Sequence, residues 1–201
     1  MLDNLKRYRV VLASNSPRRK LLLSGLDIPF EVKVLPDIDE SYPHDLPLVQ
    51  VAEYIAREKA AAYKPLMGRD ELIITADTIV IAAGEVMGKP KDADDARRML
   101  GTLSDRTHQV VTGVCIMTAE QQRSFSAMTD VTSKRLTEEE IEYYLGKYKP
   151  YDKAGAYGVQ EWIGYIGVSA INGSFYNVMG FPIQRIYNEL ASLPPLNGTS
   201  D

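Results

Sequence analysis

The chain has 201 residues, a formal net charge of −4 and a sequence pI of about 5.3, so it lacks the basic surplus of a typical nucleic-acid or membrane-surface binder. Hydrophobic residues make up 45% of it, enough for one domain with a substantial core. One cysteine, Cys115, and two histidines exclude an internal disulfide and a zinc cluster of the Cys/His type. Because no apolar run suits a membrane span or a signal peptide, we expect a cytoplasmic protein.

A strand over residues 10–13 and a helix from Pro17 to about Gly25 are predicted at the start of the chain. Ser16 is a natural N-cap, and proline suits the first helical position. The first turn then carries the three cations of residues 18–20, although the helix dipole favours negative charge there. Free backbone N–H groups, hydroxyls and guanidinium groups together suit phosphate oxygens. We therefore expect a polyphosphate site at this helix start.

The next segment combines a strand, an acidic loop and a helix, over residues 30–35, 36–47 and 49–63. Glu40 in the loop is either simply solvated or, beside a polyphosphate, a ligand of Mg²⁺, which takes one or two carboxylates with phosphate oxygens. Lys59 on the helix either snorkels along its apolar side or points into a cleft.

Asp77 lies alone within an apolar β-rich run over residues 72–83, which we expect to be interrupted at residues 75–78. A lone carboxylate is costly to bury unless it is paired or binds a metal ion. It either caps a turn at a strand end or faces a ligand cleft, where it can activate water or hold a metal. Thr78 beside it would offer a hydroxyl to the same ligand.

The following turn carries Lys89 between a glycine and a proline, as a solvated cation or as a phosphate contact. Further elements are predicted as a helix over 92–103, antiparallel strands over 109–117 and 123–133, a capped helix over 137–146, a loop with a short strand over 151–159, a strand over 163–171 and a helix over 182–193. Gln160 can donate and accept hydrogen bonds, as recognition of a base edge requires. We take the two histidines as surface or structural residues and Cys115 as a core residue.

Strands and helices alternate irregularly, which favours an α/β or α+β mixed sheet with helices on its faces and a cleft between two lobes. Residues 1–193 are expected to form one domain, and residues 194–201 a polar, disordered tail.

Taken together, the motifs resemble the Maf family of nucleoside triphosphate pyrophosphatases. They run in chain order over nearly the whole sequence: Ala13-Ser14-Asn15-Ser16-Pro17-Arg18-Arg19, Asp39-Glu40, Lys59, Thr75-Ala76-Asp77-Thr78-Ile79-Val80, Gly88-Lys89-Pro90, Ala154-Gly155-Ala156-Tyr157-Gly158-Val159-Gln160 and Asn177-Val178-Met179-Gly180-Phe181-Pro182. The resemblance implies a bent mixed sheet similar to that of inosine triphosphate pyrophosphatases. It also implies hydrolysis between the α and β phosphates, with a divalent metal such as Mg²⁺ or Mn²⁺.

By this resemblance Asp77 is the proton acceptor. Substrate selection falls to Arg18, Thr78 and Gln160, which match the branch acting on dTTP and UTP. Phosphate binding is expected of Ser14, Arg19, Lys59 and Lys89, and metal binding of Glu40 and Asp77. Whether Asp77 ligates the metal or only accepts a proton stays open.

The biological role implied is removal of non-standard pyrimidine nucleotides from the pool. A preference for 7-methyl-GTP, and a nucleotide-binding regulator of septum formation, are the alternatives. The resemblance is compatible with a homodimer and with a nucleotide as the only other partner, without nucleic-acid polymer or membrane.

Overall fold

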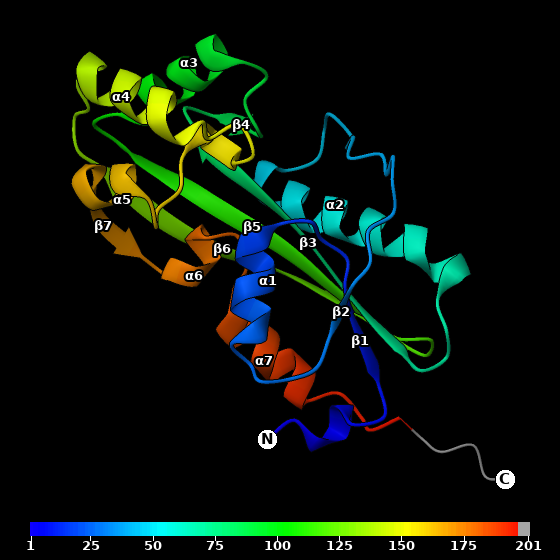
Figure 1. Cartoon of the computed structure of the whole chain (residues 1–201). Coiled ribbons are helices and arrows are strands. Elements are labelled where there is room, and N and C mark those ends of the chain that lie inside the picture. Colours follow the sequence, from blue (N-terminus) through cyan, green and yellow to red (C-terminus); the bar gives the residue numbers. More distant parts are fainter. Residues whose placement is uncertain (197–201) are drawn as a thin grey trace, which may run out of the picture.

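A seven-stranded mixed sheet forms the centre of the computed structural model, which describes residues 1–196 (Figure 1). Its strands are β1 (Arg9–Leu12), β2 (Glu31–Val32), β3 (Glu71–Ala82), β4 (Glu85–Met87), β5 (Thr107–Met117), β6 (Gln122–Ser133) and β7 (Val168–Asn172). The strand order is β2-β1-β3-β5-β6-β7, with β4 paired to β3. The predicted mixed sheet is confirmed.

Seven α-helices and three short 3₁₀ turns surround the sheet within the described residues. The helices are α1 (Pro17–Ser24), α2 (Leu48–Tyr63), α3 (Ala93–Leu103), α4 (Glu138–Tyr148), α5 (Trp162–Gly167), α6 (Phe175–Val178) and α7 (Ile183–Ala191), and the 3₁₀ turns are Asp3–Leu5, Lys64–Leu66 and Ala154–Ala156. Helix α2 covers one face of the long strands, whereas α1 and α7 lie on the other face (Figure 1). None of the helices among residues 1–196 has the length and apolarity needed to cross a bilayer.

The edge of β3 leaves a gap between two short neighbouring strands. Strand β1 pairs in parallel only with residues 71–74 of β3, and β4 pairs only with residues 80–82 on the same edge. On the opposite edge β5 pairs with β3 continuously, from Ile73 to Ile81. Residues 75–79 of β3 therefore face a gap that no strand in the described part of the chain fills.

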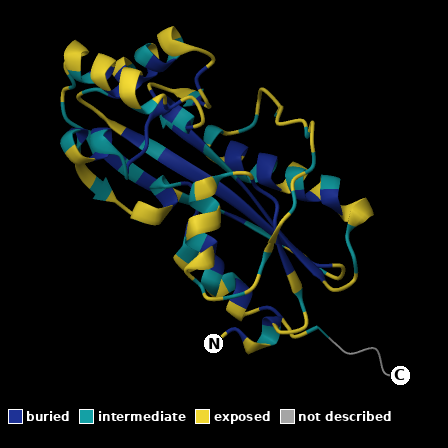
Figure 2. Cartoon of the chain, viewed as in Figure 1, coloured by how far each residue is buried: buried dark blue, intermediate teal, exposed yellow. Residues whose placement is uncertain are grey.

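Two of the apolar clusters lie toward the two ends of the sheet, and buried residues run along the central strands between them (Figure 2). One cluster packs α3, α4 and α5 on the far ends of β3 and β5, with Leu100 and Tyr144 almost fully buried. The other packs α1 and α7 around β1, with Leu12 and Phe181 at its centre. The two lobes expected from the sequence therefore share one sheet.

Helix α2 approaches the sheet closely because β5 carries a glycine at the contact. A Cβ atom on Gly113 would lie 2.2 Å from the Ala52 carbonyl carbon and from the Glu53 nitrogen. The hydroxyl of Thr75 donates to the Ala56 carbonyl oxygen at 2.6 Å. These contacts fix the helix that carries Lys59 against the strand that carries Asp77.

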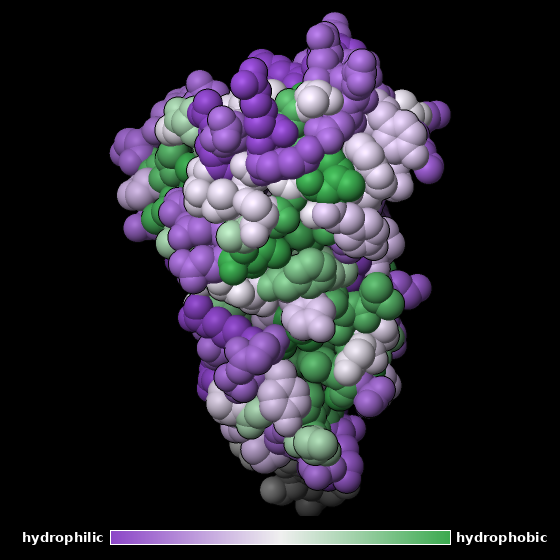
Figure 3. Space-filling model, turned by 90° about the vertical axis from the view of Figure 1, so that its left-hand side faces the viewer, coloured by the Kyte–Doolittle hydropathy of each residue, from purple (hydrophilic) through white to green (hydrophobic). Residues whose placement is uncertain are grey.

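The face that carries α6 and β7 exposes an interrupted band of apolar side chains, whereas hydrophilic side chains gather at the end formed by α3 and α4 (Figure 3). Phe175 and Tyr176 of α6 are among the exposed apolar residues. At the α3–α4 end, Arg97 pairs with Asp94 and Glu142.

Several predicted elements differ from the structure. Strand β3 is not interrupted at residues 75–78, because β5 pairs with every residue there. The predicted strand over 163–171 begins as helix α5 and becomes β7 only at Val168. The N–H groups of Gly164 and Tyr165 both donate to the Glu161 carbonyl oxygen, and the chain comes so close to itself here that a Cβ on Gly164 would lie 1.9 Å from the Val159 carbonyl oxygen.

Two other segments are shorter or differently folded than expected. The strand expected over residues 30–35 is reduced to β2, and residues 151–159 contain a 3₁₀ turn in place of a short strand. Of the expected disordered tail, residues 197–201 lie outside the described residues, so the prediction is not tested there.

Candidate active site

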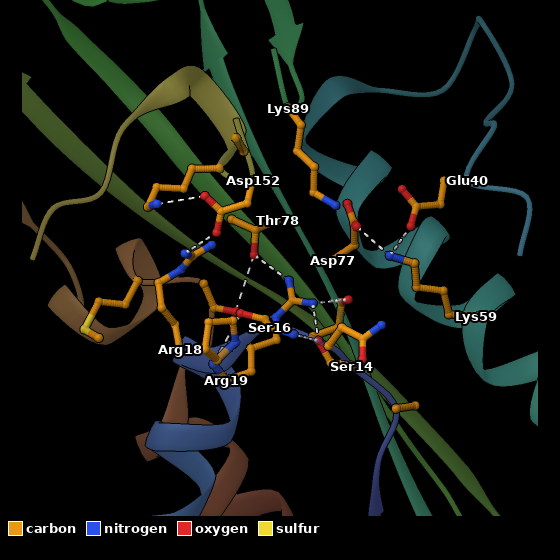
Figure 4. A pocket seen from close by; sticks show the side chains of 18 of the residues that line it. Ser14, Ser16, Arg18, Arg19, Glu40, Lys59, Asp77, Thr78, Lys89 and Asp152 are labelled. Carbon is orange, nitrogen blue, oxygen red and sulfur yellow. Dashed lines mark hydrogen bonds and ion pairs between the residues drawn. The ribbon is translucent and has the colours of Figure 1, made fainter. Parts of the chain in front are cut away.

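A cleft of about 440 Å³ lies at the gap beside β3. It is lined by every residue that the sequence singled out for phosphate, metal, proton or base: Ser14, Arg18, Arg19, Glu40, Lys59, Asp77, Thr78, Lys89 and Gln160. Because β3 exposes an edge here, side chains reach the cleft from both faces of the sheet. Asp77 contacts α2 on one face, and Thr78 contacts α1 on the other. Figure 4 shows this convergence.

The start of α1 forms one wall of the cleft. Ser16 caps the helix, since its hydroxyl accepts a hydrogen bond from the Arg19 N–H, and Pro17 follows it as expected. The buried Ser14 hydroxyl accepts from the Ser16 N–H at 3.2 Å. The short turn between β1 and α1 thus directs both hydroxyls and the helix N-terminus toward the cleft (Figure 4).

The Arg19 guanidinium joins three parts of the wall. Its Nε donates to the Gly180 carbonyl oxygen at 2.9 Å, and Nη1 donates to Ala76 O at 2.8 Å and to Ser14 Oγ at 3.3 Å. Nη2 donates to Thr78 Oγ1 at 3.0 Å. Four of the five guanidinium N–H groups therefore have acceptors within residues 1–196, and one has none there. Burial lowers the pKa of Arg19, and the charges of Asp77 and Glu40 oppose that shift.

Lys59 bridges the two acidic residues of the cleft. Its Nζ lies 2.8 Å from Asp77 Oδ1 and 2.7 Å from Glu40 Oε1. Burial acts to raise the pKa of Glu40, but the hydrogen bond and charge of Lys59, with the charges of Lys89 and Arg19, outweigh it and hold the pKa below its usual value. Both carboxylates thus face one cationic position (Figure 4).

The donor set around that position suits a hard divalent cation. Two carboxylates that converge on one Nζ atom can converge equally on Mg²⁺ or Mn²⁺, which prefer oxygen ligands. Among residues 1–196 no cluster of three or more His, Cys, Asp or Glu side chains is arranged for a metal. A cation held by Glu40 and Asp77 would therefore complete its coordination with water or with phosphate oxygens of a ligand.

Lys89 approaches the same acids from the opposite lobe. It follows β4, and its amine points toward Asp77 in Figure 4. The turn that carries it is fixed to the next wall of the cleft, because the Gly155 N–H donates to the Gly88 carbonyl oxygen at 3.0 Å. Lys89 lines the cleft and is exposed, so both interpretations from the sequence, a phosphate contact and a solvated cation, stay open.

The residues expected to select the substrate do not form one cluster. Thr78 is hydrogen-bonded to Arg19 and lies 3.0 Å from the hydroxyl of Thr112. Arg18 pairs instead with Asp152, with Nη1 and Oδ2 2.9 Å apart. Gln160 lines the cleft, and its Oε1 is buried without a hydrogen-bond partner among the described residues.

Sequence reasoning missed two charged residues of the site, Asp152 and Lys153. Both line the cleft, and Lys153 is buried with 8% of its surface exposed. The signal available was an adjacent acid and base directly before a glycine-containing segment, which sequence alone does not distinguish from a solvated pair. The histidines are as expected: His44 is exposed, and His108 is buried with its Nε2 2.8 Å from the Tyr157 hydroxyl.

The sequence is similar to a known protein family and to several curated proteins. The family described as Maf-like protein matches residues 9–193. A dTTP/UTP pyrophosphatase of Parabacteroides distasonis is 64% identical over 190 residues, which cover 94% of this chain and 98% of that protein. A dTTP/UTP pyrophosphatase of Phocaeicola vulgatus is 62% identical over 193 residues, covering 96% of this chain and 100% of that protein.

Among solved structures, a HAM1 protein from Coxiella burnetii aligns with a TM-score of 0.51 and 15% identity, covering 92% of this chain and 100% of that chain. At this identity the likeness concerns the fold alone. It confirms the predicted fold class, a mixed sheet similar to that of inosine triphosphate pyrophosphatases.

Proposed function

The chain belongs to the Maf family, and we propose that it hydrolyses dTTP and UTP to the nucleoside monophosphate and pyrophosphate. The observation that carries the proposal is the position of Asp77, an acid in a cleft whose other walls supply cations, hydroxyls and a helix N-terminus. Such a cleft suits a ligand with several negative charges and places a proton acceptor beside them.

The phosphates are proposed to lie between α1 and the lysines of the opposite wall. Lys59 and Lys89 provide ammonium groups, and Ser14 and the start of α1 provide hydroxyl and backbone donors. Arg19 contributes one N–H to the ligand and uses the others to fix the wall, so its larger effect is to hold Ser14 and Thr78 in place.

Glu40 and Asp77 are proposed to hold the divalent cation, with phosphate oxygens as further ligands. When bound, the cation neutralises charge on the phosphates and lowers the pKa of water beside it. Lys59, which contacts both carboxylates, also lines the cleft and could contact phosphate oxygens of the ligand there.

Asp77 is proposed to accept the proton of the attacking water. Its Oδ1 lies on the cleft side of β3, and 15% of the side chain is exposed, so water reaches it from the cleft. The close contacts of α2 with β5 and β3 hold Lys59 against the strand that carries Asp77, which supports a fixed position of the carboxylate in the cleft.

The base is proposed to lie near Gln160 and Arg18. An amide without a protein partner can offer its oxygen or its NH₂ group to the edge of a pyrimidine. Thr78 acts from the other side, through a hydroxyl already oriented by Arg19 and Thr112.

A panel of nucleoside triphosphates with Mg²⁺ or Mn²⁺, assayed for pyrophosphate release, tests the proposal. We expect dTTP and UTP to be the best substrates, and Asp77→Asn to lower kcat by about 10²- to 10⁴-fold while nucleotide binding persists. A preference for 7-methyl-GTP would contradict the pyrimidine assignment. Binding of dTTP and UTP without pyrophosphate release by the unmodified protein would favour the nucleotide-binding regulator.

A further inference from the structure

Arg18 and Gln160, the two residues proposed to contact the base, come from opposite walls of the cleft but are joined by a chain of charged and polar side chains. Arg18 Nη1 lies 2.9 Å from Asp152 Oδ2, and Asp152 Oδ1 lies 2.8 Å from Lys153 Nζ. The same Nζ lies 3.0 Å from Glu161 Oε1. This row of side chains therefore reaches from α1 to Glu161, the residue next to Gln160.

The far end of this chain fixes the turn on which Gln160 sits. The Tyr144 hydroxyl donates to Glu161 Oε2 and accepts from the Gly158 N–H, whose nitrogen lies 3.0 Å away. The Glu161 N–H donates to the Gly158 carbonyl oxygen at 3.0 Å, which closes the turn around Gln160. Since the Gln160 side chain has no protein partner of its own in residues 1–196, this turn is what sets its position.

Lys153 is the central member of the chain. Its side chain is only 9% exposed, and a buried ammonium is costly unless carboxylates pair with it. It has two such partners, Asp152 toward Arg18 and Glu161 toward Gln160. Burial acts to raise the pKa of Asp152, but hydrogen bonds and charges from Lys153 and Arg18 outweigh it and lower the pKa, so the carboxylate stays charged.

We propose that Lys153 is a positioning residue for substrate selection, which couples Arg18 and Gln160 so that they contact the base as a unit. This inference rests on the proposed function, because it assigns Lys153 a part in the base preference of the same cleft. The main rival is a direct contact between Lys153 and phosphate, since the residue also lines the cleft.

Binding measurements separate these roles. In an Asp77→Asn background, which slows turnover, the affinities for dTTP and dCTP are compared by calorimetry. The nucleotide dCTP is informative because its triphosphate and deoxyribose are the same, while its base differs in the donors and acceptors of its edge and lacks the 5-methyl group. We expect Lys153→Met to reduce the preference for dTTP over dCTP by about tenfold, and Lys153→Arg to restore most of it.

Lys89→Met serves as the matched control. Lys89 lies in the same cleft but outside the Arg18–Gln160 chain, so its loss should weaken both nucleotides by a similar factor. If Lys153→Met behaves like Lys89→Met and leaves the preference intact, Lys153 is a phosphate contact and the inference is overturned.

A double-mutant cycle provides a readout that a merely structural role would not move. With Lys153 present, the fold-change in dTTP preference of the Arg18→Ala/Gln160→Ala double variant should differ by about threefold or more from the product of the two single fold-changes. In the Lys153→Met background the same two effects should multiply. Multiplication in both backgrounds, or failure in both, contradicts the proposal.

The Lys153→Met protein can lose its fold because two acids become unpaired. Asp152→Asn then tests the same coupling: the Asp152 side chain is 54% exposed, and the substitution removes one charge while retaining a polar group. We expect it to reduce the dTTP preference as well, and an unchanged preference overturns the inference. If the unmodified protein releases no pyrophosphate yet binds dTTP selectively through Lys153, the proposed hydrolysis fails while the inference stands.

Discussion

Lys59 donates a hydrogen bond to Asp77 across the contact between α2 and β3, with Nζ and Oδ1 2.8 Å apart. The same ammonium contacts Glu40, so a protein cation lies where the two acids would otherwise bind a metal. Metal binding to the free protein therefore competes with Lys59.

Replacing this lysine should expose the competition. In Lys59→Met the two carboxylates repel each other without a cation between them, so we expect Mn²⁺ to bind the nucleotide-free protein about tenfold more tightly, while dTTP binds more weakly. Calorimetry or electron paramagnetic resonance of Mn²⁺ measures the first effect. In Lys89→Met, which removes a nearby charge but no hydrogen bond or ion pair to either acid among the described residues, the Mn²⁺ affinity should change much less. Equal Mn²⁺ affinity in Lys59→Met and the unmodified protein would contradict competition.

Gly113→Ala should destabilise the protein by about 3 kcal/mol, because the new Cβ would lie 2.2 Å from the backbone of α2 and force the helix away. Urea unfolding measures the change. Gly146→Ala is the matched control: an added Cβ meets no atom within 4 Å, and alanine should stabilise this exposed helix position by about 1 kcal/mol. A Gly113→Ala protein as stable as the original would show that α2 shifts without cost.

The stability of the protein should fall as the pH drops below about 6.5, through His108. Burial lowers the pKa of His108 to about 4, so the unfolded chain binds this proton more strongly than the folded protein does. The contribution is complete above the unfolded pKa and decreases by up to about 1.4 kcal/mol per pH unit until the pH reaches the folded pKa.

His108→Gln isolates this contribution from that of the carboxylates. The free energy of unfolding of each protein is measured between pH 7 and pH 4. We expect the variant to be the less stable at pH 7, since it loses the contact with Tyr157, and the difference to shrink toward pH 4. Parallel curves for the two proteins would refute the assignment to His108.

Cys115 should resist thiol reagents in the folded protein. It is buried, and burial raises the pKa of its thiol to about 12, so almost no thiolate forms at neutral pH. Labelling by Ellman's reagent should be slow in buffer and rapid in denaturant. Rapid labelling under native conditions would mean that β5 opens without global unfolding.

Local signals in the sequence were sufficient for the elements that depend on local chemistry. The caps at Ser16 and Thr137 were predicted because a hydroxyl two or three residues before free N–H groups acts within one turn. The helix α5 was missed because its apolar residues resemble those of a strand. The chain approaches itself closely at Gly164, where a Cβ would lie 1.9 Å from the Val159 carbonyl oxygen, and the apolar pattern does not indicate this approach.

In the candidate site too, some features could be predicted from the sequence and others could not. Asp77 was recognisable as a lone carboxylate in an apolar run, and the structure places it in the cleft. The pairing of Arg18 with Asp152 was not predictable, because 134 residues separate them along the chain. Likewise, no sequence pattern indicates that Arg19 has most of its N–H groups occupied by the protein itself.

The hydrogen bond between Arg19 and Gly180 can form only late in translation. Its partners are 161 residues apart, and Gly180 is followed by Phe181, which is fully buried in the lobe that α1 and α7 share. During translation Arg19 can meet Ser14, Ala76 and Thr78 early, but its Nε cannot donate to the Gly180 carbonyl oxygen until this late segment has left the ribosome. The wall of the cleft should therefore be completed only when translation is nearly finished.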